Sequence, residues 1–262
     1  MEWQLFRERG FRIEIINGLI TAVRTLTVIS VPGPEVKKRF YSLPWFVVAG
    51  LIVGLVQYYF GTFLFTWKSG LLNIAAFFMV VINYILTGGL HLDGLADSAD
   101  AFGIVRSREK NLKILKDSHI GVFGAGAIVL GIVWRLISYN YLLSLNQAIW
   151  IVYGISLSRI IQGLILLHIP YVRGSEGKAY GYKGPFFISI ILIIQLIIFI
   201  RFIAFYHDIR AAIIPFCTAI LILLPLLILF IRRLGGFTGD CLGAVTEIFE
   251  YTYLTASYFL LI

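Results

Sequence analysis

Seven long apolar runs dominate this sequence and restrict the kind of fold that it can adopt. They cover approximately residues 43–66, 70–90, 120–145, 147–169, 185–206, 210–231 and 240–262. Each run is long enough to cross the hydrocarbon of a bilayer as a helix, which takes about 20 residues. Because backbone polar groups in lipid must pair within the protein, helices are expected here and open strands are not. A further stretch, residues 11–31, carries charges and predicts an N-terminal interfacial or re-entrant helix.

Composition supports a membrane protein. The chain is 59% hydrophobic and 14% charged, whereas soluble domains average roughly 45–50% and 25%. This excludes disordered and ordinary water-soluble classes. The two cysteines, Cys217 and Cys241, offer neither a disulfide framework nor metal-ligand spacing. We therefore predict an all-α, polytopic transmembrane helix bundle with about seven spans, in which residues 1–262 form a single integral membrane domain.

Positive charges gather in alternate connections between the runs. The net charge is +8, and the Lys and Arg residues concentrate around 37–39, 106–116, 173–183 and 232–233. The opposite connections carry only Lys68 and Arg210, with Arg201 near the end of a span. Because Lys and Arg are enriched in cytoplasmic loops, the four basic segments are predicted to face the cytoplasm. The positive charge thus indicates membrane topology, and no nucleic-acid partner is expected.

Half of the 14 acidic residues fall in two regions, with Asp93, Asp97, Asp100 and Asp117 in the first and Asp240, Glu247 and Glu250 in the second. The first stretch, TGGLHLDGLADSADAFG, places Asp93, Asp97 and Asp100 on one face of a helix, because offsets of four and seven residues nearly complete whole turns. Three carboxylates this close repel one another unless a cation lies among them. Oxygen ligands favour a hard ion such as Mg²⁺. The adjacent His91 fits a ligand, a proton shuttle or a hydrogen-bonded neighbour equally well.

The second acidic stretch, GGFTGDCLGAVTEIFE, lies at the start of the last apolar run and carries Asp240, Glu247 and Glu250. Ionisable groups in such a run are costly and usually functional. We expect these acids to share one site with the first stretch. The alternative is that Glu247 and Glu250 form intramembrane ion pairs with Arg135 or Arg159. Arg159 is nearer the cytoplasmic end of its run and is the better candidate for binding a substrate phosphate.

These motifs resemble a known family. GGLHLDGLADSADAFG, followed by REKNLKILKDSHIGVFG, and the C-terminal GGFTGDCLGAVTEIFE closely resemble the two signatures of the cobalamin synthase, or adenosylcobinamide-GDP ribazoletransferase, family. Fainter likeness lies in VPGP (31–34) and LSR (157–159). His119 departs from the Arg that is common in the family, and residues 173–182 fit its Arg/Gly-rich loop loosely. The resemblance implies a Mg²⁺-dependent transferase in the plasma (inner) membrane of a prokaryote, with its active site facing the cytoplasm.

The resemblance also implies the substrates and the site. The enzyme would join adenosylcobinamide-GDP to α-ribazole, or its 5′-phosphate, and release GMP. The expected catalytic residues are Asp93, Asp97, Asp100, His91 and Asp240. The expected Mg²⁺ ligands are Asp93, Asp97, Asp100, Asp240 and Glu247. The expected substrate-binding residues are Arg159, Asp117, Ser118, Gly94, Gly239 and Thr238.

Two alternatives remain open from the sequence. A CDP-alcohol phosphotransferase-like enzyme also pairs clustered Asp residues with Mg²⁺ at a membrane, but HLDGLADSAD lacks the DG-x₂-AR opening of that family. A cation transporter would line a pathway with its acids. Here the acids cluster at the cytoplasmic side and not at a midplane site between repeats.

Overall fold

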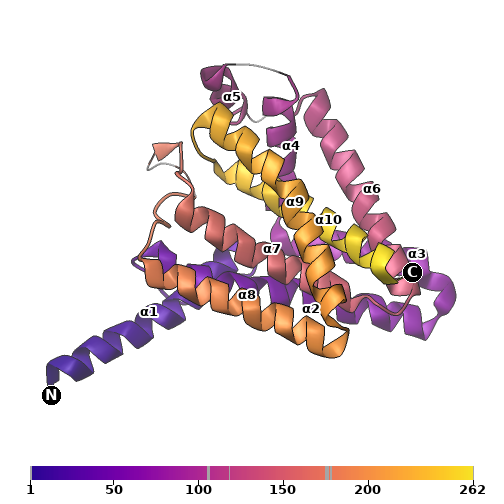
Figure 1. Cartoon of the computed structure of the whole chain (residues 1–262), viewed down its shortest axis with the longest axis horizontal. Helices are drawn as coiled ribbons and strands as arrows, with labels where there is room; N and C mark the ends of the chain where they lie inside the picture. Colours follow the sequence, from indigo (N-terminus) through magenta and orange to yellow (C-terminus); the bar gives the residue numbers. More distant parts are fainter. Residues whose placement is uncertain (1, 105–106, 118, 175–176, 178, 262) are drawn as a thin grey trace.

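The protein is described by a computed structural model that covers residues 2–104, 107–117, 119–174, 177 and 179–261, without the side chains of residues 2–13 and 69. Its elements follow one another as α1 (Glu2–Leu26), η1 (Arg39–Trp45), α2 (Phe46–Trp67), η2 (Ser69–Leu71), α3 (Leu72–Thr87), α4 (Leu90–Phe102), α5 (Arg108–Ile114), α6 (Val122–Ser144), α7 (Ile149–His168), α8 (Phe186–Tyr206), α9 (Ile209–Leu234) and α10 (Gly239–Leu261) (Figure 1). The only bridge between extended segments in the described chain joins Tyr171 to Phe237. The predicted all-α membrane helix bundle is confirmed.

Among the described helices, fewer than the seven expected spans are recognised by length and apolar composition alone. Five described helical segments are long and apolar enough to cross a membrane: Arg39–Trp67, α6, α7, α8 and α9. The pair α3–α4 adds a sixth if it is counted as one broken span. The expected span 70–90 yields α3, which has only 16 residues. The expected span 240–262 yields α10, a helix of 23 residues that carries three acids. The N-terminal stretch forms one continuous helix, α1, and not a re-entrant pair.

A glycine pair produces the sharp bend between α3 and α4. Gly88 and Gly89 have φ of +60° and +69°, in the left-handed region that glycine adopts at little cost. The backbone N–H of Gly89 donates to Tyr84 O at 3.0 Å, which closes the end of α3. The two helices meet at 87°. As a result, α4, the helix that carries Asp93, Asp97 and Asp100, turns sharply away from the direction of α3.

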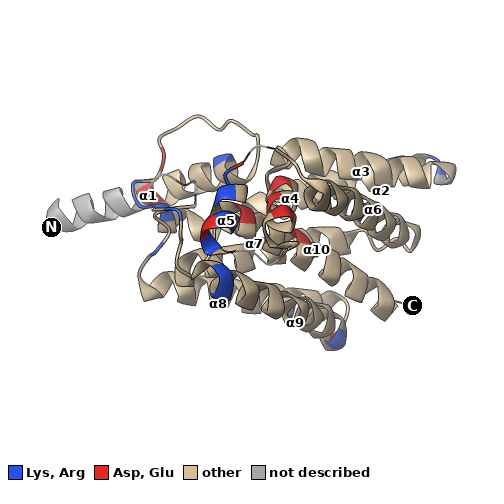
Figure 2. Cartoon of the chain, turned by 90° about the horizontal axis from the view of Figure 1, so that it is seen from above, with Lys and Arg blue, Asp and Glu red and all other residues tan. Residues whose placement is uncertain are grey.

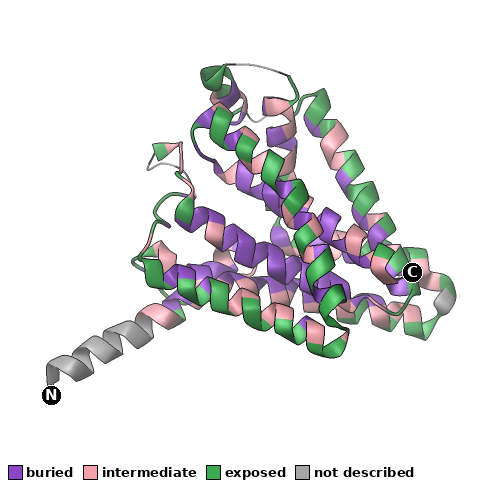
Figure 3. Cartoon of the chain, in the orientation of Figure 1, coloured by how far each residue is buried: buried purple, intermediate pink, exposed green. Residues whose placement is uncertain are grey.

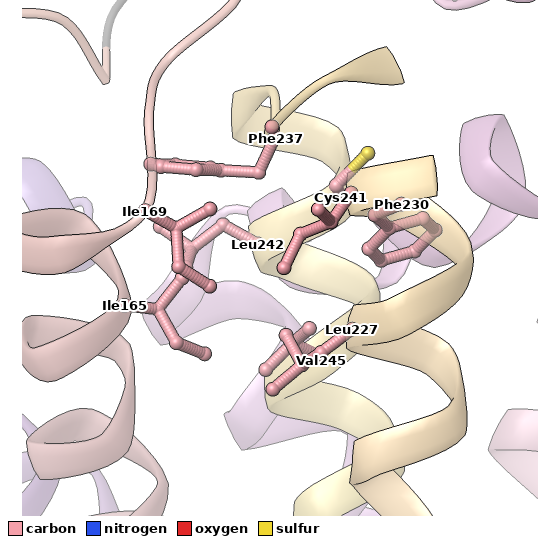
Figure 4. A pocket seen from close by; sticks show the side chains of 10 residues that line it. Ile165, Ile169, Leu227, Phe230, Phe237, Cys241, Leu242 and Val245 are labelled. Atoms are coloured by element: carbon pink, nitrogen blue, oxygen red, sulfur yellow. The ribbon is translucent and has the colours of Figure 1, made fainter. Parts of the chain in front are cut away.

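The core of the bundle is centred on α7. Most residues of α7 are buried, and it packs against α2, α8 and α10. Figure 3 shows α7 and α10 as largely buried, whereas α6, α8 and α9 expose one side. Large apolar side chains cover these outer surfaces, as expected where lipid replaces water. Figure 4 shows apolar side chains of α7, α9 and α10, among them Ile165, Phe230 and Val245, that line a small pocket. This pocket has no room for a water molecule.

Hydrogen bonds connect the four basic segments to one another at one end of the bundle. The guanidinium of Arg39 donates to Tyr180 O at 3.4 Å. The guanidinium of Arg173 donates to Leu115 O. Arg108 Nε donates to Leu234 O at 2.8 Å, which ties α5 to the end of α9. The basic segments therefore lie on one side, as the alternation of charge predicted, and Figure 2 shows the acids of α4 beside the basic residues of α5.

Candidate active site

The two acidic stretches come together because α4 packs tightly against the start of α10. At Gly94 a Cβ atom would lie 2.6 Å from Asp240 O and 3.1 Å from Gly243 Cα. Only glycine fits at this distance, so the contact sets how near the acidic face of α4 comes to α10. Gly94, which was expected to bind substrate, therefore has a packing role in the structure.

Replacing Gly94 by Ala is expected to lower the thermal stability of the protein by several degrees. The added methyl group overpacks the α4–α10 contact, which typically costs about 1–3 kcal/mol. The matched control is Gly126→Ala on α6, because nothing lies within 4 Å of the added Cβ there. The control should be neutral or stabilising, since Ala is the better helix former. Equal melting temperatures for the two variants in detergent would contradict the tight contact.

Asp93, Asp97 and Asp240 form the centre of the candidate site, which we call the acidic site. Asp93 is exposed, and Asp97 and Asp240 are partly buried. Asp97 is repelled by the charges of Asp93, Asp240 and Asp100 and attracted by that of Arg173. Such a group of like charges is unfavourable unless cations or donors compensate it.

Asp100 shares the acidic face of α4 but has a structural contact. Its carboxylate oxygens accept the backbone N–H groups of Gly121 at 2.7 Å and Gly124 at 2.9 Å, at the start of α6. The first N–H groups of a helix have no partner within the helix, so a carboxylate there stabilises the helix end. Asp100 thus joins α4 to α6. This contact makes it a weaker candidate for ligating a metal than Asp93 or Asp97.

Arg173 brings a positive charge into the acidic site. Its guanidinium pairs with Asp240 Oδ2 at 2.7 Å. The loop that carries it is held by backbone hydrogen bonds, from Val172 N–H to Phe237 O and from Phe237 N–H to Pro170 O, both at 3.0 Å. Sequence reasoning did not select Arg173, because positive charge in a cytoplasmic loop needs no functional reason. Only its pairing with Asp240 distinguishes it from the other loop arginines.

Two acids of α10 lie away from the acidic site, in a buried charge network made of Arg135, Arg159, Glu247 and Glu250. Arg135 pairs with Glu247 at 2.6 Å and with Glu250 at 3.0 Å. Arg159 pairs with Glu250 at 3.3 Å. All four residues are buried. Glu247 was expected to ligate Mg²⁺ and Arg159 to bind a phosphate. The structure instead has the intramembrane ion pairs that the sequence left as the alternative, because a buried charge is stable only beside a partner.

His91 connects the buried charge network to α4. Its Nδ1 lies 3.5 Å from Nη2 of Arg159. Its Nε2 is buried and makes no hydrogen bond within the described part of the chain. The side chain is 2% exposed, and it stands two residues before Asp93. In this arrangement His91 is a neighbour of the acidic site that contacts the network, and it is not paired with any of the acids.

The remaining expected substrate-binding residues have different surroundings. Thr238 is buried, and its hydroxyl donates to Asp240 Oδ2 at 3.3 Å, just ahead of Gly239. Asp117 is exposed and lies 2.6 Å from His119 Nδ1. The hydrogen bonds from His119 hold the pKa of Asp117 below its usual value. Ser118 lies outside the described residues.

The donor atoms of the acidic site suit a divalent cation, although their present arrangement does not form a coordination shell. Carboxylate oxygens are the ligands that Mg²⁺ prefers. Among the described residues, no three His, Cys, Asp or Glu side chains are arranged to hold a metal ion. Two of the carboxylates already have other partners: Asp240 pairs with Arg173, and Asp100 accepts a hydrogen bond from the backbone N–H of Gly121.

Comparison with known proteins extends over nearly the whole chain. The family described as cobalamin-5-phosphate synthase matches residues 18–258. A protein of Chlorobium phaeobacteroides strain BS1, named adenosylcobinamide-GDP ribazoletransferase, is 35% identical over 94% of this chain and 98% of its own length. Proteins of the same name from Pelodictyon phaeoclathratiforme and Clostridium botulinum are 36% and 34% identical, over 90% and 70% of this chain and 94% and 73% of their own. No solved structure matches the chain.

Proposed function

Because this chain belongs to the cobalamin-5-phosphate synthase family and is therefore an enzyme of the transferase class, we propose that it joins adenosylcobinamide-GDP to α-ribazole, or to its 5′-phosphate, and releases GMP. The observation that carries the proposal is the match to relatives named for this reaction, over nearly the full length of both chains. The acidic site also supports the proposal. The reaction takes place at a pyrophosphate, and carboxylates that bind Mg²⁺ would hold the cation that neutralises the charge of this group.

The reaction proposed is a displacement at phosphorus. A ribose hydroxyl oxygen of the ribazole attacks the phosphorus that carries the cobinamide. The bond from this phosphorus to the bridging oxygen breaks, and GMP leaves with the electron pair. The proton of the hydroxyl goes to a carboxylate of the acidic site that acts as general base. The protein must also neutralise the charge on the phosphoryl oxygens, which is usually the largest part of such catalysis.

We assign Mg²⁺ binding to Asp93, Asp97 and Asp240. The mutual repulsion of these acids supports this assignment, because a cation among them would remove it. Bound Mg²⁺ would supply charge neutralisation on the phosphoryl oxygens and the leaving group. Asp100 and Glu247 are not included, since the α6 backbone and Arg135 occupy them.

Arg173 is assigned to the pyrophosphate. A guanidinium binds phosphate oxygens through paired hydrogen bonds. Arg173 has 18% of its side chain exposed and already reaches Asp240. If Asp240 turns to a cation, the guanidinium of Arg173 is released beside it and can donate to the phosphoryl oxygens instead. Arg173 would thus exchange one anionic partner for another without moving its loop.

The proposal is tested with purified protein in lipid vesicles. Adenosylcobinamide-GDP and ribazole 5′-phosphate are supplied with Mg²⁺, and GMP release is measured together with the corrinoid product. We expect GMP in a 1:1 ratio to product, and no reaction after exhaustive chelation. Transport of cations without GMP release would contradict the enzyme proposal. Full activity without a divalent cation would contradict the Mg²⁺ assignment alone.

The acidic site is proposed to face the cytoplasm. In a Cys217→Ser background, a cysteine replacing Lys110 on α5 should react with an impermeant thiol reagent only from the inner side of the plasma membrane. A cysteine replacing Lys68, beyond α2, should react only from the outer side. Both lysines are exposed, so the substitutions leave the fold unchanged. The reverse labelling pattern would overturn the orientation.

A further inference from the structure

A cavity lined by basic residues lies at the same end of the bundle as the acidic site. It has a volume of about 350 Å³, within the range of about 300–1,000 Å³ that is typical of ligand pockets. We call it the basic cavity. Its lining residues are Lys37, Lys38, Arg39, Phe40, Gly177, Tyr180, Gly181 and Lys183.

Packed contacts between two distant segments build the basic cavity. The segment 37–40 leads into α2, and the described segment 179–183 leads into α8. The guanidinium of Arg39 donates to Tyr180 O at 3.4 Å and lies 5.9 Å from the ring centre of Tyr182. Tyr182 is buried against Phe46. The cavity is therefore a fixed feature of the fold and not a chance gap between two loops.

Three lysines of the basic cavity have no ion-pair partner among the described residues. They are Lys37, Lys38 and Lys183, and none of the described lining residues is acidic. Within the described part of the chain, no ion pair joins Lys37, Lys38 or Lys183 to a carboxylate. Glu14 lies nearby and accepts the backbone N–H of Lys37 at 3.3 Å. Membrane topology accounts for positive charge at this end of the bundle, but not for its convergence on one cavity. A bound anion would relieve the repulsion.

The basic cavity lies within a short distance of the acidic site along the chain. Arg173, which contacts Asp240, precedes the cavity residue Gly177 by four positions. Covalent geometry limits the separation of their Cα atoms to about 14 Å. This is comparable to the size of a nucleotide. A nucleotide-sized molecule at the acidic site can therefore extend toward the rim of the basic cavity at Gly177.

We propose that the basic cavity binds the phosphate group of a phosphate ester, held by Lys38 and Lys183. This inference rests on the proposed function: we assign the phosphate to the 5′-phosphate of the ribazole acceptor, which would place the ribose hydroxyl toward the acidic site. The same chemistry would also recognise the phosphate of an anionic lipid headgroup at the membrane surface. The experiment below distinguishes these two sources.

The experiment uses the Lys38→Gln/Lys183→Gln double variant. The matched control is Lys110→Gln/Lys113→Gln on α5, which removes the same charge from the same end of the bundle. Both pairs are exposed, so folding should be unchanged. Binding of ribazole 5′-phosphate and of unphosphorylated ribazole is measured by calorimetry on protein in phosphatidylcholine nanodiscs. Bound phosphatidylglycerol is measured by mass spectrometry after exchange into mixed lipid.

We expect the double variant to bind ribazole 5′-phosphate at least about tenfold more weakly, the usual effect of losing a charge-assisted hydrogen bond. Its affinity for ribazole and the affinities of the control should not change. If phosphatidylglycerol retention falls instead, the occupant is a lipid, and the assignment to the acceptor is wrong. Unchanged binding of both phosphate esters overturns the basic cavity as a phosphate site. Because binding is measured without turnover, these outcomes are independent of whether GMP release is observed.

Discussion

Replacing Asp97 by Asn is expected to lower the turnover number by at least about 10²-fold while the protein remains folded. The substitution keeps the shape of the side chain but removes the charge that is placed between Asp93, Asp240 and Arg173. Loss of one main electrostatic stabiliser typically has an effect of this size. GMP release at saturating substrate and Mg²⁺ is the measurement, with the melting temperature recorded on the same samples.

The control for this experiment is Glu109→Gln. Glu109 is exposed in the first turn of α5, at the same end of the bundle, and its substitution makes the same change of charge. It should retain the parent rate. A rate for Asp97→Asn within a factor of two of the control would remove Asp97 from the site. An equal loss in both variants would indicate a general effect of charge and not a specific site.

The largest effect on stability is expected at Glu250. Its carboxylate pairs with Arg135 and Arg159 and accepts a hydrogen bond from Ser158 at 2.9 Å. Glu250→Gln leaves two buried arginines with one carboxylate. Removing one partner of a buried ion pair typically costs about 3–5 kcal/mol. For a chain of this size, that corresponds to a fall in melting temperature on the order of 10 °C, measurable by thermal unfolding in detergent.

A second substitution tests whether charge balance is the cause. Adding Arg159→Met to Glu250→Gln restores one positive charge to one negative charge in the network. The double variant should be more stable than the sum of the two single changes predicts. Additive losses would mean that packing, and not pairing, determines the stability of this region.

A substitution at Glu247 distinguishes its role as an ion-pair partner of Arg135 from the role of Mg²⁺ ligand that the sequence predicted. If Glu247 is a partner of Arg135, Glu247→Gln should destabilise the protein and leave the Mg²⁺ concentration for half-maximal rate unchanged. If Glu247 is a metal ligand, the same substitution should raise that concentration with little loss of stability. A stable variant that requires more Mg²⁺ would return Glu247 to the acidic site.

The sequence predicted much of the fold because the apolar runs are long. The segments 120–145, 147–169, 185–206 and 210–231 agree with α6 to α9 within a few residues. The acidic face of α4 followed from the spacing of Asp93, Asp97 and Asp100. The bend at Gly88 and Gly89 was not predicted, because a glycine pair in a membrane helix also fits simple packing.

The partners of the charged groups were harder to predict than the helices. Whether Glu247 faces Arg135 or Asp93 depends on how α10 is rotated against α4 and α6, which no spacing within α10 determines. Arg173 contacts Asp240 only because its loop pairs with Phe237. Long-range contacts of this kind are absent from local sequence patterns.

The buried charge network also bears on how the chain enters the membrane. An isolated α10 would bring Glu247 and Glu250 into lipid, at a cost of several kcal/mol. The partners Arg135 and Arg159 lie on α6 and α7, which leave the ribosome earlier. Stable integration of α10 should therefore follow that of α6 and α7. A fragment of this last helix alone would remain outside the bilayer, so the order of synthesis is part of how this protein reaches its fold.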